Sequence, residues 1–356
     1  MIDRIAKIRH GIEEAGCDGF FSLSAPANTY LSGFQGSTSA VILTPRHALF
    51  LCDFRYTEQA QQQVGDYDID EVRGTIETRL GERLKALGCT TVGFDPTAHT
   101  VYQADTVTEA FGGRLDPLPD IVAGLRMRKD PEEIERIRAA SLLAEGALLD
   151  MLESLEAGRA ERELAAELEY QFKVRGAEGA SFEAIALFGA RSSLPHGRPS
   201  ARSLEAADIV LVDCGCVLDG YCSDLTRTCA FGTMPGAWFE DIYAVVLAAQ
   251  RAAIEAVRPG VRCADVDAVA RDMIRAAGYG DHFGHGLGHG VGLEVHEAPR
   301  LNMESTAVLE PGMVVTVEPG IYLPGRGGVR IEELVAVTDT GCEVLTQSPR
   351  ELKVLA

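Results

Sequence analysis

The chain has 356 residues, of which 46% are hydrophobic, and a formal net charge of -20. This length and hydrophobic content are typical of a globular protein with two domains of ordinary size. The negative charge repels nucleic acid and anionic membranes, and no cluster of Lys or Arg offsets it, so we expect neither as a partner. The N-terminal residues contain no uninterrupted apolar run, which predicts no signal peptide, no membrane span and a cytoplasmic location.

Nine cysteines are scattered from Cys17 to Cys342. An odd number of cysteines in a chain without an export signal is typical of buried, reduced thiols. We therefore expect no structural disulfide.

The first part of the chain alternates helical and strand-like segments. Ile2, Ile5, Ile8 and Ile12 recur at helical spacing, which predicts an amphipathic helix over residues 2–16. Strands are expected at residues 19–23, 40–44, 48–52 and 91–94, with helices near 56–63 and 76–87. This alternation predicts an α/β domain over residues 1–125.

A strong helix start marks a second domain, which we place at residues 126–356. Asp130 is suited to the N-cap, Pro131 to the first helical position and Glu133 to a returning capping bond. This helix should continue toward Leu155. Beyond it the pattern predicts a helix at 162–174, strands from 182, helices around 237–257 and 264–277, and glycine-rich strands up to the C-terminus.

Two strands are expected on either side of Asp219-Gly220, a strong signal for a two-residue hairpin turn. The register set by this turn places Asp213 opposite Thr226, so that Asp213 and Asp224 are diagonal neighbours on one face, with Cβ atoms about 7 Å apart. The flanking residues are apolar or small, and an unpaired charge among them would be costly. The two carboxylates are therefore suited to hold metal ions between them.

The same register places Cys214 and Cys216 on the opposite face of the hairpin from the two aspartates, whereas Cys222 shares the aspartate face. A non-reactive cysteine usually serves as a small apolar residue. We interpret all three thiols in this way and not as metal ligands.

Residues 281–297 contain four of the eight histidines of the chain among five glycines. Glycine at this density argues against a helix and predicts irregular backbone that approaches another group closely. The imidazoles of His285, His289 and His296 are available for metal binding or proton transfer. His282 has the weakest case and is left out of the site.

Glutamates end or interrupt two later strands, Glu318 in Val-Glu-Pro-Gly and Glu332 in Arg-Ile-Glu. With Asp213, Asp224 and His289 they form an oxygen-rich set with one nitrogen donor, which suits Mn²⁺, Co²⁺ or Zn²⁺ better than a thiol-seeking ion. Bridging carboxylates hold two such ions about 3.5 to 4 Å apart.

These residues give the sequence its resemblance to the pita-bread metallopeptidase family, which contains methionine aminopeptidase, aminopeptidase P and prolidase. The likeness covers nearly the whole chain, and the motif residues match in order and spacing. It implies an α/β N-terminal, creatinase-like domain followed by an α+β pita-bread catalytic domain. It also implies two divalent ions, with Mn²⁺ as the expected metal: Asp213 binds one ion, Asp224 and Glu332 bridge both, and His289 with Glu318 complete the second site.

The resemblance further assigns roles in peptide hydrolysis. Two cations supply hydroxide at neutral pH and polarise the scissile carbonyl, and Glu318 resembles the family's candidate proton shuttle. The proline-specific branch is marked by His196 in Leu-Pro-His-Gly, by His285 and by His296 in Val-His-Glu, which in the family contact the substrate carbonyl and line the proline pocket. Arg330 matches an active-site arginine of the same branch.

The N-terminal region, with Tyr30-Leu-Ser-Gly-Phe-Gln-Gly and Asp53-Phe-Arg-Tyr-Thr-Glu-Gln-Ala, is similar to the accessory domain of bacterial Xaa-Pro peptidases. In the resembling enzymes this domain narrows the entrance and supports dimerisation. The resemblance therefore implies a homodimer that acts on short proline-containing peptides.

Two activities of this branch stay open. The N-terminal motifs favour an Xaa-Pro aminopeptidase, which accepts longer peptides and in which Arg300 would be structural and paired with an acid. A prolidase, or Xaa-Pro dipeptidase, anchors the carboxylate of a dipeptide, usually with arginine. Some prolidases place this arginine where the chain has Glu304, and others where it has Arg300. Creatinase and the non-catalytic, protein-binding pita-bread modules lack the five ligands present here, which disfavours both.

Overall fold

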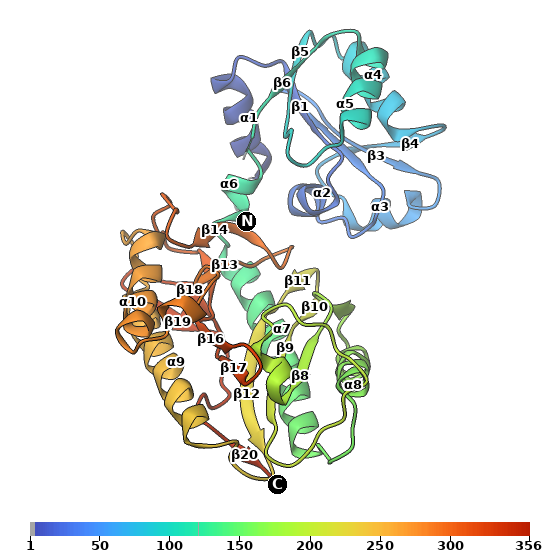
Figure 1. Cartoon of the computed structure of the whole chain (residues 1–356). Helices are drawn as coiled ribbons and strands as arrows, with labels where there is room; N and C mark the ends of the chain where they lie inside the picture. Colours follow the sequence, from blue (N-terminus) through green and yellow to red (C-terminus); the bar gives the residue numbers. More distant parts are fainter. Residues whose placement is uncertain (1–3, 120) are drawn as a thin grey trace. The chain divides into compact units, whose positions relative to one another are not determined.

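The computed structural model describes residues 4–119 and 121–356 (Figure 1). The chain divides after Arg126 into two compact units, each with its own core. In the described part of the chain, none of the helices has the length and apolar character that a membrane span requires.

The first unit is an α/β domain around a six-stranded sheet, with the strand order β4-β3-β2-β1-β5-β6 in its described part. Strands β1, β2 and β3 pair antiparallel, whereas β4, β5 and β6 each join a parallel neighbour. The strands are β1 (Gly19–Ser22), β2 (Ala40–Leu43), β3 (Ala48–Asp53), β4 (Asp68–Val72), β5 (Thr91–Phe94) and β6 (Arg114–Pro117). The helices are α1 (Arg4–Glu14), α2 (Ala25–Ser32), α3 (Thr57–Gln63), α4 (Ile76–Ala86), α5 (Val101–Phe111) and α6 (Ala123–Arg126).

The elements predicted for this unit are confirmed to within a few residues. Helix α1 buries Ile8 and Ile12, as the isoleucine spacing predicts, whereas Ile2 lies outside the described residues. The sequence did not reveal strands β4 and β6, which form the two edges of the sheet. Their exposed charged residues, such as Asp68 and Arg114, hide the alternation that marks a strand, and charges of this kind also discourage pairing with other chains.

The second unit, residues 127–356, is described throughout and is an α+β domain. Its main sheets have the orders β20-β12-β9-β8 and β14-β13-β15-β18-β19, and smaller sheets are formed by β11-β10-β7 and β16-β17. The helices are α7 (Pro131–Glu153), α8 (Glu161–Val174), α9 (Ala237–Ala256) and α10 (Cys263–Ala276), with the short 3₁₀ helices η1 (Gly189–Ser193) and η2 (Gly280–His282). The strands are β7 (Gly179–Ala180), β8 (Ile185–Phe188), β9 (Ile209–Cys214), β10 (Cys216–Leu218), β11 (Tyr221–Cys222), β12 (Leu225–Phe231), β13 (Gly288–Gly290), β14 (Glu297–Leu301), β15 (Val314–Val317), β16 (Gly320–Leu323), β17 (Gly327–Arg330), β18 (Glu333–Val337), β19 (Cys342–Val344) and β20 (Val354–Leu355).

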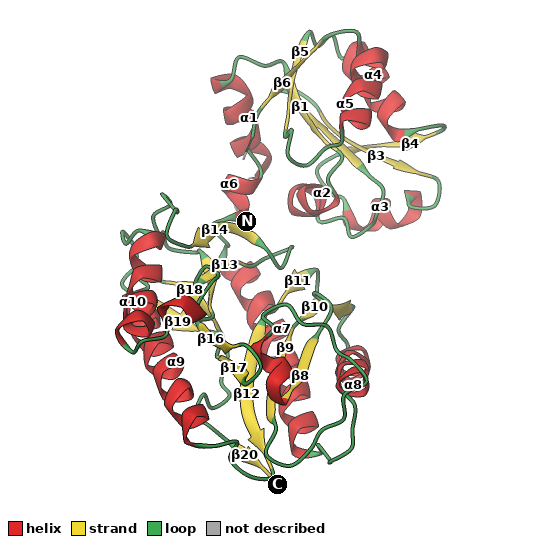
Figure 2. Cartoon of the chain, in the orientation of Figure 1, coloured by secondary structure: helices red, strands yellow, loops and turns green. Residues whose placement is uncertain are grey.

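The four predicted helices of this unit are confirmed, and they flank the strands in two pairs (Figure 2). Helices α7 and α8 share a buried cluster with Val210 and Val212 of β9. Helices α9 and α10 share another with Val315 of β15 and Val335 of β18. Because alternate residues of β9 face α7 and α8, Asp213 points away from that pair of helices.

The start of α7 has the predicted capping box. Asp130 Oδ1 accepts a bond of 2.9 Å from the Glu133 backbone N–H, and Glu133 Oε2 accepts one of 2.9 Å from the Asp130 N–H. The second oxygen of Glu133 accepts a bond of 2.8 Å from the hydroxyl of Tyr221 in β11. The Glu133 side chain thus caps the start of α7 and also attaches the helix to the hairpin that carries Asp213 and Asp224.

The hairpin has the predicted register, with Leu218 opposite Tyr221 and Asp213 opposite Thr226. Asp219 and Gly220 both have positive φ, 49° and 79°, as a type I′ turn requires. The Asp219-Gly220 turn therefore fixes the relative position of Asp213 and Asp224, although neither residue belongs to the turn.

Candidate metal centre and active site

Five elements bring the predicted metal ligands together. Asp213 lies in β9, Asp224 directly precedes β12, His289 is central in β13, Glu318 directly follows β15, and Glu332 lies between β17 and β18. Both main sheets therefore contribute, and the ligands gather where strands from the two sheets end beside each other.

Asp224, His289 and Glu332 form the centre of this cluster. Each offers a donor atom within 4.8 Å of the others, and the three residues are 5%, 6% and 1% exposed. His289 Nε2 lies 3.6 Å from Asp224 Oδ2 and 3.3 Å from Glu318 Oε1. A histidine and three carboxylates thus surround one buried point.

Asp213 is held from one side only. Its Oδ2 accepts a bond of 2.5 Å from Arg330 Nη2, whereas its Oδ1 is buried and has no hydrogen-bond partner among the described residues. A buried carboxylate oxygen without a partner is unfavourable unless another group binds it. A cation in the cluster would satisfy this oxygen.

The electrostatics of the cluster also favour bound cations. Burial, followed by repulsion from Glu332, raises the pKa of Asp224 well above its ordinary value, and burial with repulsion from Glu318 does the same to the pKa of Glu332. Burial likewise raises the pKa of Asp213. For Glu318 burial acts in the same direction, but the neighbouring His289, His285 and Arg330 together outweigh it and lower the pKa. Four clustered carboxylates, three of them buried, need more positive charge than Arg330 supplies to be ionised together, so this donor set fits divalent cations.

The cluster opens into a cavity of ≈ 670 Å³. This volume falls within the range of about 300 to 1,000 Å³ that is usual for small-molecule sites. All nine residues predicted for the site line the cavity: Asp213, Asp224, His289, Glu318, Glu332, His196, His285, His296 and Arg330. His282, which the sequence analysis left out, does not line it, and neither do the three hairpin cysteines.

The hairpin cysteines belong to the apolar interior. Cys214 and Cys216 lie in the core beneath α7 and α8, and Cys222 packs in a neighbouring core with Val291. Burial raises the pKa of Cys214 well above its ordinary value and that of Cys222 to about 12. These thiols remain protonated at neutral pH, and all nine cysteines of the chain are free.

The predicted histidines occupy different depths of the cavity. His196 and His296 are exposed, whereas His285 is half-buried. The ring of His296 stands edge-on to that of His289, with the centroids 4.4 Å apart. Although His296 is exposed at the cavity, partial desolvation of its ring, followed by the neighbouring His289, lowers its pKa, so this imidazole is neutral at neutral pH and able to accept a proton.

Tyr322 of β16 is a site residue that sequence reasoning missed. Its hydroxyl lies 2.9 Å from His285 Nε2 and 2.9 Å from Arg330 Nη1, and burial raises its pKa to about 12. His285 Nδ1 lies 2.8 Å from the carbonyl oxygen of Gly286, which requires a proton on Nδ1. The tyrosine hydroxyl therefore donates to Nε2 and accepts from Arg330, and this chain fixes the orientation of the His285 ring.

Thr226 was also missed. Its hydroxyl donates a bond of 2.6 Å to Glu332 Oε2 and accepts one of 3.1 Å from Arg330 Nε. The position was visible in the hairpin register, because Thr226 lies opposite Asp213. Nothing in the sequence showed that Glu332, 106 residues further on, would lie beside it.

The glycines around His289 make room for neighbouring strands. A Cβ atom on Gly288 would lie 2.1 Å from the carbonyl oxygen of Thr316, and one on Gly290 would lie 2.2 Å from that of Ala298. The predicted close approach of the backbone is confirmed, although the approaching groups are strands β15 and β14 and not a ligand. Strand β13 is thus confined between β14 and β15, and this confinement fixes the position of His289 relative to the neighbouring carboxylates.

The fold and the site define a class of protein. An α/β domain followed by an α+β domain with a buried cluster of carboxylates and histidine is the arrangement of pita-bread metallopeptidases. Residues 135–339 match the sequence pattern of Metallopeptidase family M24, and residues 4–128 match that of the Creatinase/Prolidase N-terminal domain. The chain belongs to metallopeptidase family M24, a family of metal-dependent hydrolases.

The chain is similar over nearly its whole length to proteins of this family. It is 46% identical over 355 residues to the Xaa-Pro dipeptidase of Pyrococcus furiosus, which covers 99% of this chain and 100% of that protein. Among solved structures, the Xaa-Pro dipeptidase from Bacillus anthracis superposes with a TM-score of 0.96 at 40% identity, covering 99% of both chains. The X-Pro aminopeptidase from Thermotoga maritima gives a TM-score of 0.90 at 38% identity, covering 96% of this chain and 99% of that one. The fold implied by the resemblance is therefore confirmed.

Proposed function

We propose that this protein is an Xaa-Pro dipeptidase that uses two divalent metal ions, with Mn²⁺ as the working metal. The observation that carries the choice of dipeptidase is the position of Arg300. Its side chain lines the cavity, and its strand position in β14 is opposite His289 of β13. A cation so close to the metal cluster is suited to bind the carboxylate of a dipeptide whose scissile bond lies at the metals.

Arg300 is also available for such a partner. The sequence allowed a structural arginine paired with an acid, but no carboxylate of the described residues forms an ion pair with Arg300, and the residue is exposed. By contrast, the other arginine on the cavity rim, Arg198, lies 3.6 Å from Glu183. This difference favours Arg300 as the substrate anchor and moves the preference away from the aminopeptidase that the N-terminal motifs favour.

The five clustered residues are proposed as the metal ligands with the roles that the resemblance implies: Asp213 on one ion, Asp224 and Glu332 on both, and His289 with Glu318 on the second. Two divalent cations held there would lower the pKa of a shared water and polarise the scissile carbonyl. Thr226 and Arg330 orient the carboxylates of Glu332 and Asp213 from outside this set.

The remaining residues act on the substrate and on protons. Glu318 is proposed, as the resemblance implies, to take the proton from the attacking water and to pass it to the leaving nitrogen of proline. His196 and His296 face the cavity and are proposed to bind the substrate carbonyl. His285 is proposed as a wall of the proline pocket, because its Nε2 is already bound by Tyr322.

An Xaa-Pro aminopeptidase is the second candidate. It is favoured by the similarity to the Thermotoga maritima enzyme and by a cavity large enough for residues beyond proline. A panel of Xaa-Pro dipeptides, Xaa-Pro-Yaa tripeptides and longer peptides, assayed with added Mn²⁺, separates the two. We expect kcat/KM to be highest for the dipeptides; a preference for tripeptides or longer chains would support the aminopeptidase.

The Arg300→Ala variant tests the proposed anchor. Loss of a charge-assisted bond worth about 1.5 to 3 kcal/mol should raise KM for Xaa-Pro dipeptides by about 10- to 150-fold and leave KM for tripeptides nearly unchanged. Arg198→Ala is the matched control, because it removes a cavity arginine that already has a carboxylate partner. Equal effects of Arg300→Ala on dipeptides and tripeptides would refute the anchor and with it the preference for the dipeptidase.

We further propose that residues 1–125 act as the accessory domain, that residues 126–356 carry catalysis and that the enzyme is a homodimer acting on short proline-containing peptides. The mass of the purified protein in solution, measured by light scattering, tests the oligomeric state. Metal analysis of the same sample tests the opposing view of a non-catalytic module, which would bind no metal.

A further inference from the structure

We propose that Arg227, three residues after Asp224, positions the metal ligand Glu332 from outside the cavity. It also connects this ligand to the C-terminal segment, residues 347–348. This inference rests on the proposed metallopeptidase function. Arg227 lies in β12, is 6% exposed and does not line the cavity, so it touches neither substrate nor metal. Its effect on catalysis must therefore pass through the residues it holds.

One end of the guanidinium group fixes the backbone at the ligand. Arg227 Nη1 donates a bond of 2.7 Å to the carbonyl oxygen of Glu332 and one of 3.1 Å to that of Thr226. These two residues are already joined, since Thr226 Oγ1 donates to the Glu332 carboxylate at 2.6 Å and Glu332 N donates to the Thr226 carbonyl at 3.2 Å. One NH₂ group of the guanidinium thus holds the ligand Glu332 and the residue that orients its carboxylate, Thr226.

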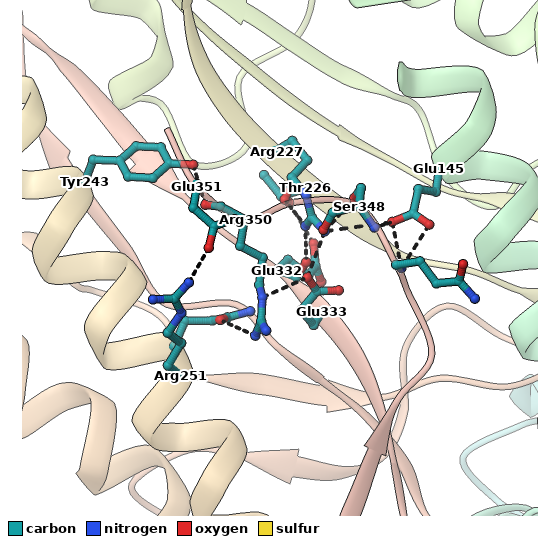
Figure 3. Close-up of polar contacts among 12 residues, drawn as sticks. Glu145, Thr226, Arg227, Tyr243, Arg251, Glu332, Glu333, Ser348, Arg350 and Glu351 are labelled. Carbon is teal, nitrogen blue, oxygen red and sulfur yellow. Dashed lines mark hydrogen bonds and ion pairs between the residues drawn. The ribbon is translucent and has the colours of Figure 1, made fainter. Parts of the chain in front are cut away.

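The other end of the same group reaches the C-terminal segment (Figure 3). Arg227 Nη2 donates to Glu333 Oε1 at 2.7 Å, to Ser348 Oγ at 2.7 Å and to the Ser348 carbonyl at 3.2 Å. The backbone N–H groups of Gln347 and Ser348 in turn donate to the buried carboxylate of Glu145 in α7. Residues 347–348 are therefore held between helix α7 and the arginine.

The polar contacts around Arg227 are not arranged for stability alone. Arg227 Nε and Glu333 Oε2 are buried without a hydrogen-bond partner among the described residues, and each such atom is costly. Buried ion pairs also contribute little to stability, on balance, compared with apolar residues of the same size. The planar fork of arginine, which reaches two carbonyls on one side and Ser348 on the other, explains why this residue type is present.

The Arg227→Lys variant is the main test, because lysine keeps the positive charge beside Glu333 and loses the fork. We expect its Mn²⁺ affinity, measured by titration calorimetry on metal-free protein, to fall by about 10- to 100-fold, as is typical when a group that orients a ligand is replaced. At saturating Mn²⁺ much of kcat should return, and KM for Xaa-Pro dipeptides should stay near the wild-type value. Recovery of kcat at saturating Mn²⁺ and an unchanged KM distinguish the loss of Glu332 positioning from a general disruption of the fold.

Arg202→Lys is the matched control. Arg202 binds Asp208 through two bonds of 2.6 and 2.7 Å in the same unit, and neither residue lines the cavity. The Arg202→Lys variant should have a lower free energy of unfolding in urea than the wild type and the same Mn²⁺ affinity. Should Arg227→Lys also destabilise the metal-free protein while its Mn²⁺ affinity equals that of the wild type, Arg227 is merely structural and the inference is overturned.

Ser348→Ala decides the question if Arg227→Lys does not fold. It leaves the Arg227–Glu333 ion pair in place and removes one acceptor at the far end, which should weaken Mn²⁺ binding by about two- to tenfold. Unchanged affinity in this variant overturns the connection to the C-terminal segment. A wild-type protein that binds no divalent ion would refute the proposed function itself, an outcome that the first titration separates from the others.

Discussion

Replacing Asp224 with Asn, or Glu332 with Gln, is expected to abolish peptide hydrolysis and to lower the number of metal ions bound per chain. Each substitution keeps the size of the side chain and removes one negative charge from the position proposed to bridge two cations. A neutral amide cannot balance two dications. Since the cations contribute several kcal/mol to stabilising the transition state, kcat should fall by about three orders of magnitude or more.

The fold should survive these two changes. Burial raises the pKa of both carboxyls well above their ordinary values, with added repulsion from Glu332 on Asp224 and from Glu318 on Glu332. Replacing one of them by an amide therefore removes the cost of burying an ionisable group in the metal-free protein. The unfolding free energy in urea with a chelator should therefore equal or exceed that of the metal-free wild type. Asp219→Asn is the control: it makes the same chemical change at an exposed turn position with φ of 49°, which asparagine tolerates. Full turnover by Asp224→Asn or Glu332→Gln at unchanged metal content would refute the dinuclear site.

Replacing His289 and His296 with Ala should have different consequences although the two rings touch. His289 is buried and lies 3.3 Å from Glu318 and 3.6 Å from Asp224, so its loss removes a ligand and should empty part of the metal site. His296 is exposed to the cavity, and we assign it to the substrate. His296→Ala should keep its metal and lose about 10²- to 10⁴-fold in kcat, the usual effect of removing a group that transfers or shares a proton.

Metal content and kcat measured on the same samples test this division. The His296→Phe variant keeps an aromatic ring against His289 and should also retain metal, which separates loss of chemistry from loss of packing. His282→Ala, a histidine of the same glycine-rich segment outside the cavity, should resemble the wild type in both measurements. If His289→Ala and His296→Ala lose equal amounts of metal, the assignment of one as ligand and the other as substrate contact is wrong.

Part of the site could be predicted because local rules fix it, whereas His196 and Arg330 were implied only by the family resemblance. The Asp219-Gly220 turn determines the register of the hairpin, and the register places Asp213 and Asp224 on one face. The capping signals at Asp130 located the first helix of the second domain. In both cases the deciding interaction joins residues close in the sequence, so a pattern of a few residues carries the information.

The residues that were missed depend on contacts between distant segments. Tyr322 belongs to the site because β16 places its hydroxyl between His285 and Arg330, and a tyrosine in a strand gives no sign of this in the sequence. Arg227 is an unremarked arginine in a strand until Ser348 is seen beside it. The charged edge strands of the first unit were missed for another reason, since exposure to solvent removes the apolar alternation on which strand prediction depends.

The confinement of strand β13 affects how a mutational map of this enzyme should be interpreted. Alanine at position 288 or 290 would place a methyl group within about 2 Å of a carbonyl oxygen, so the strand would have to move and carry His289 with it. In a saturation scan scored by activity, substitutions of Gly288 and Gly290 would then be tolerated as poorly as substitutions of the metal ligands. The region outlined by such a scan would be larger than the set of groups that take part in the chemistry, and engineering of substrate preference should begin at the exposed rim of the cavity instead.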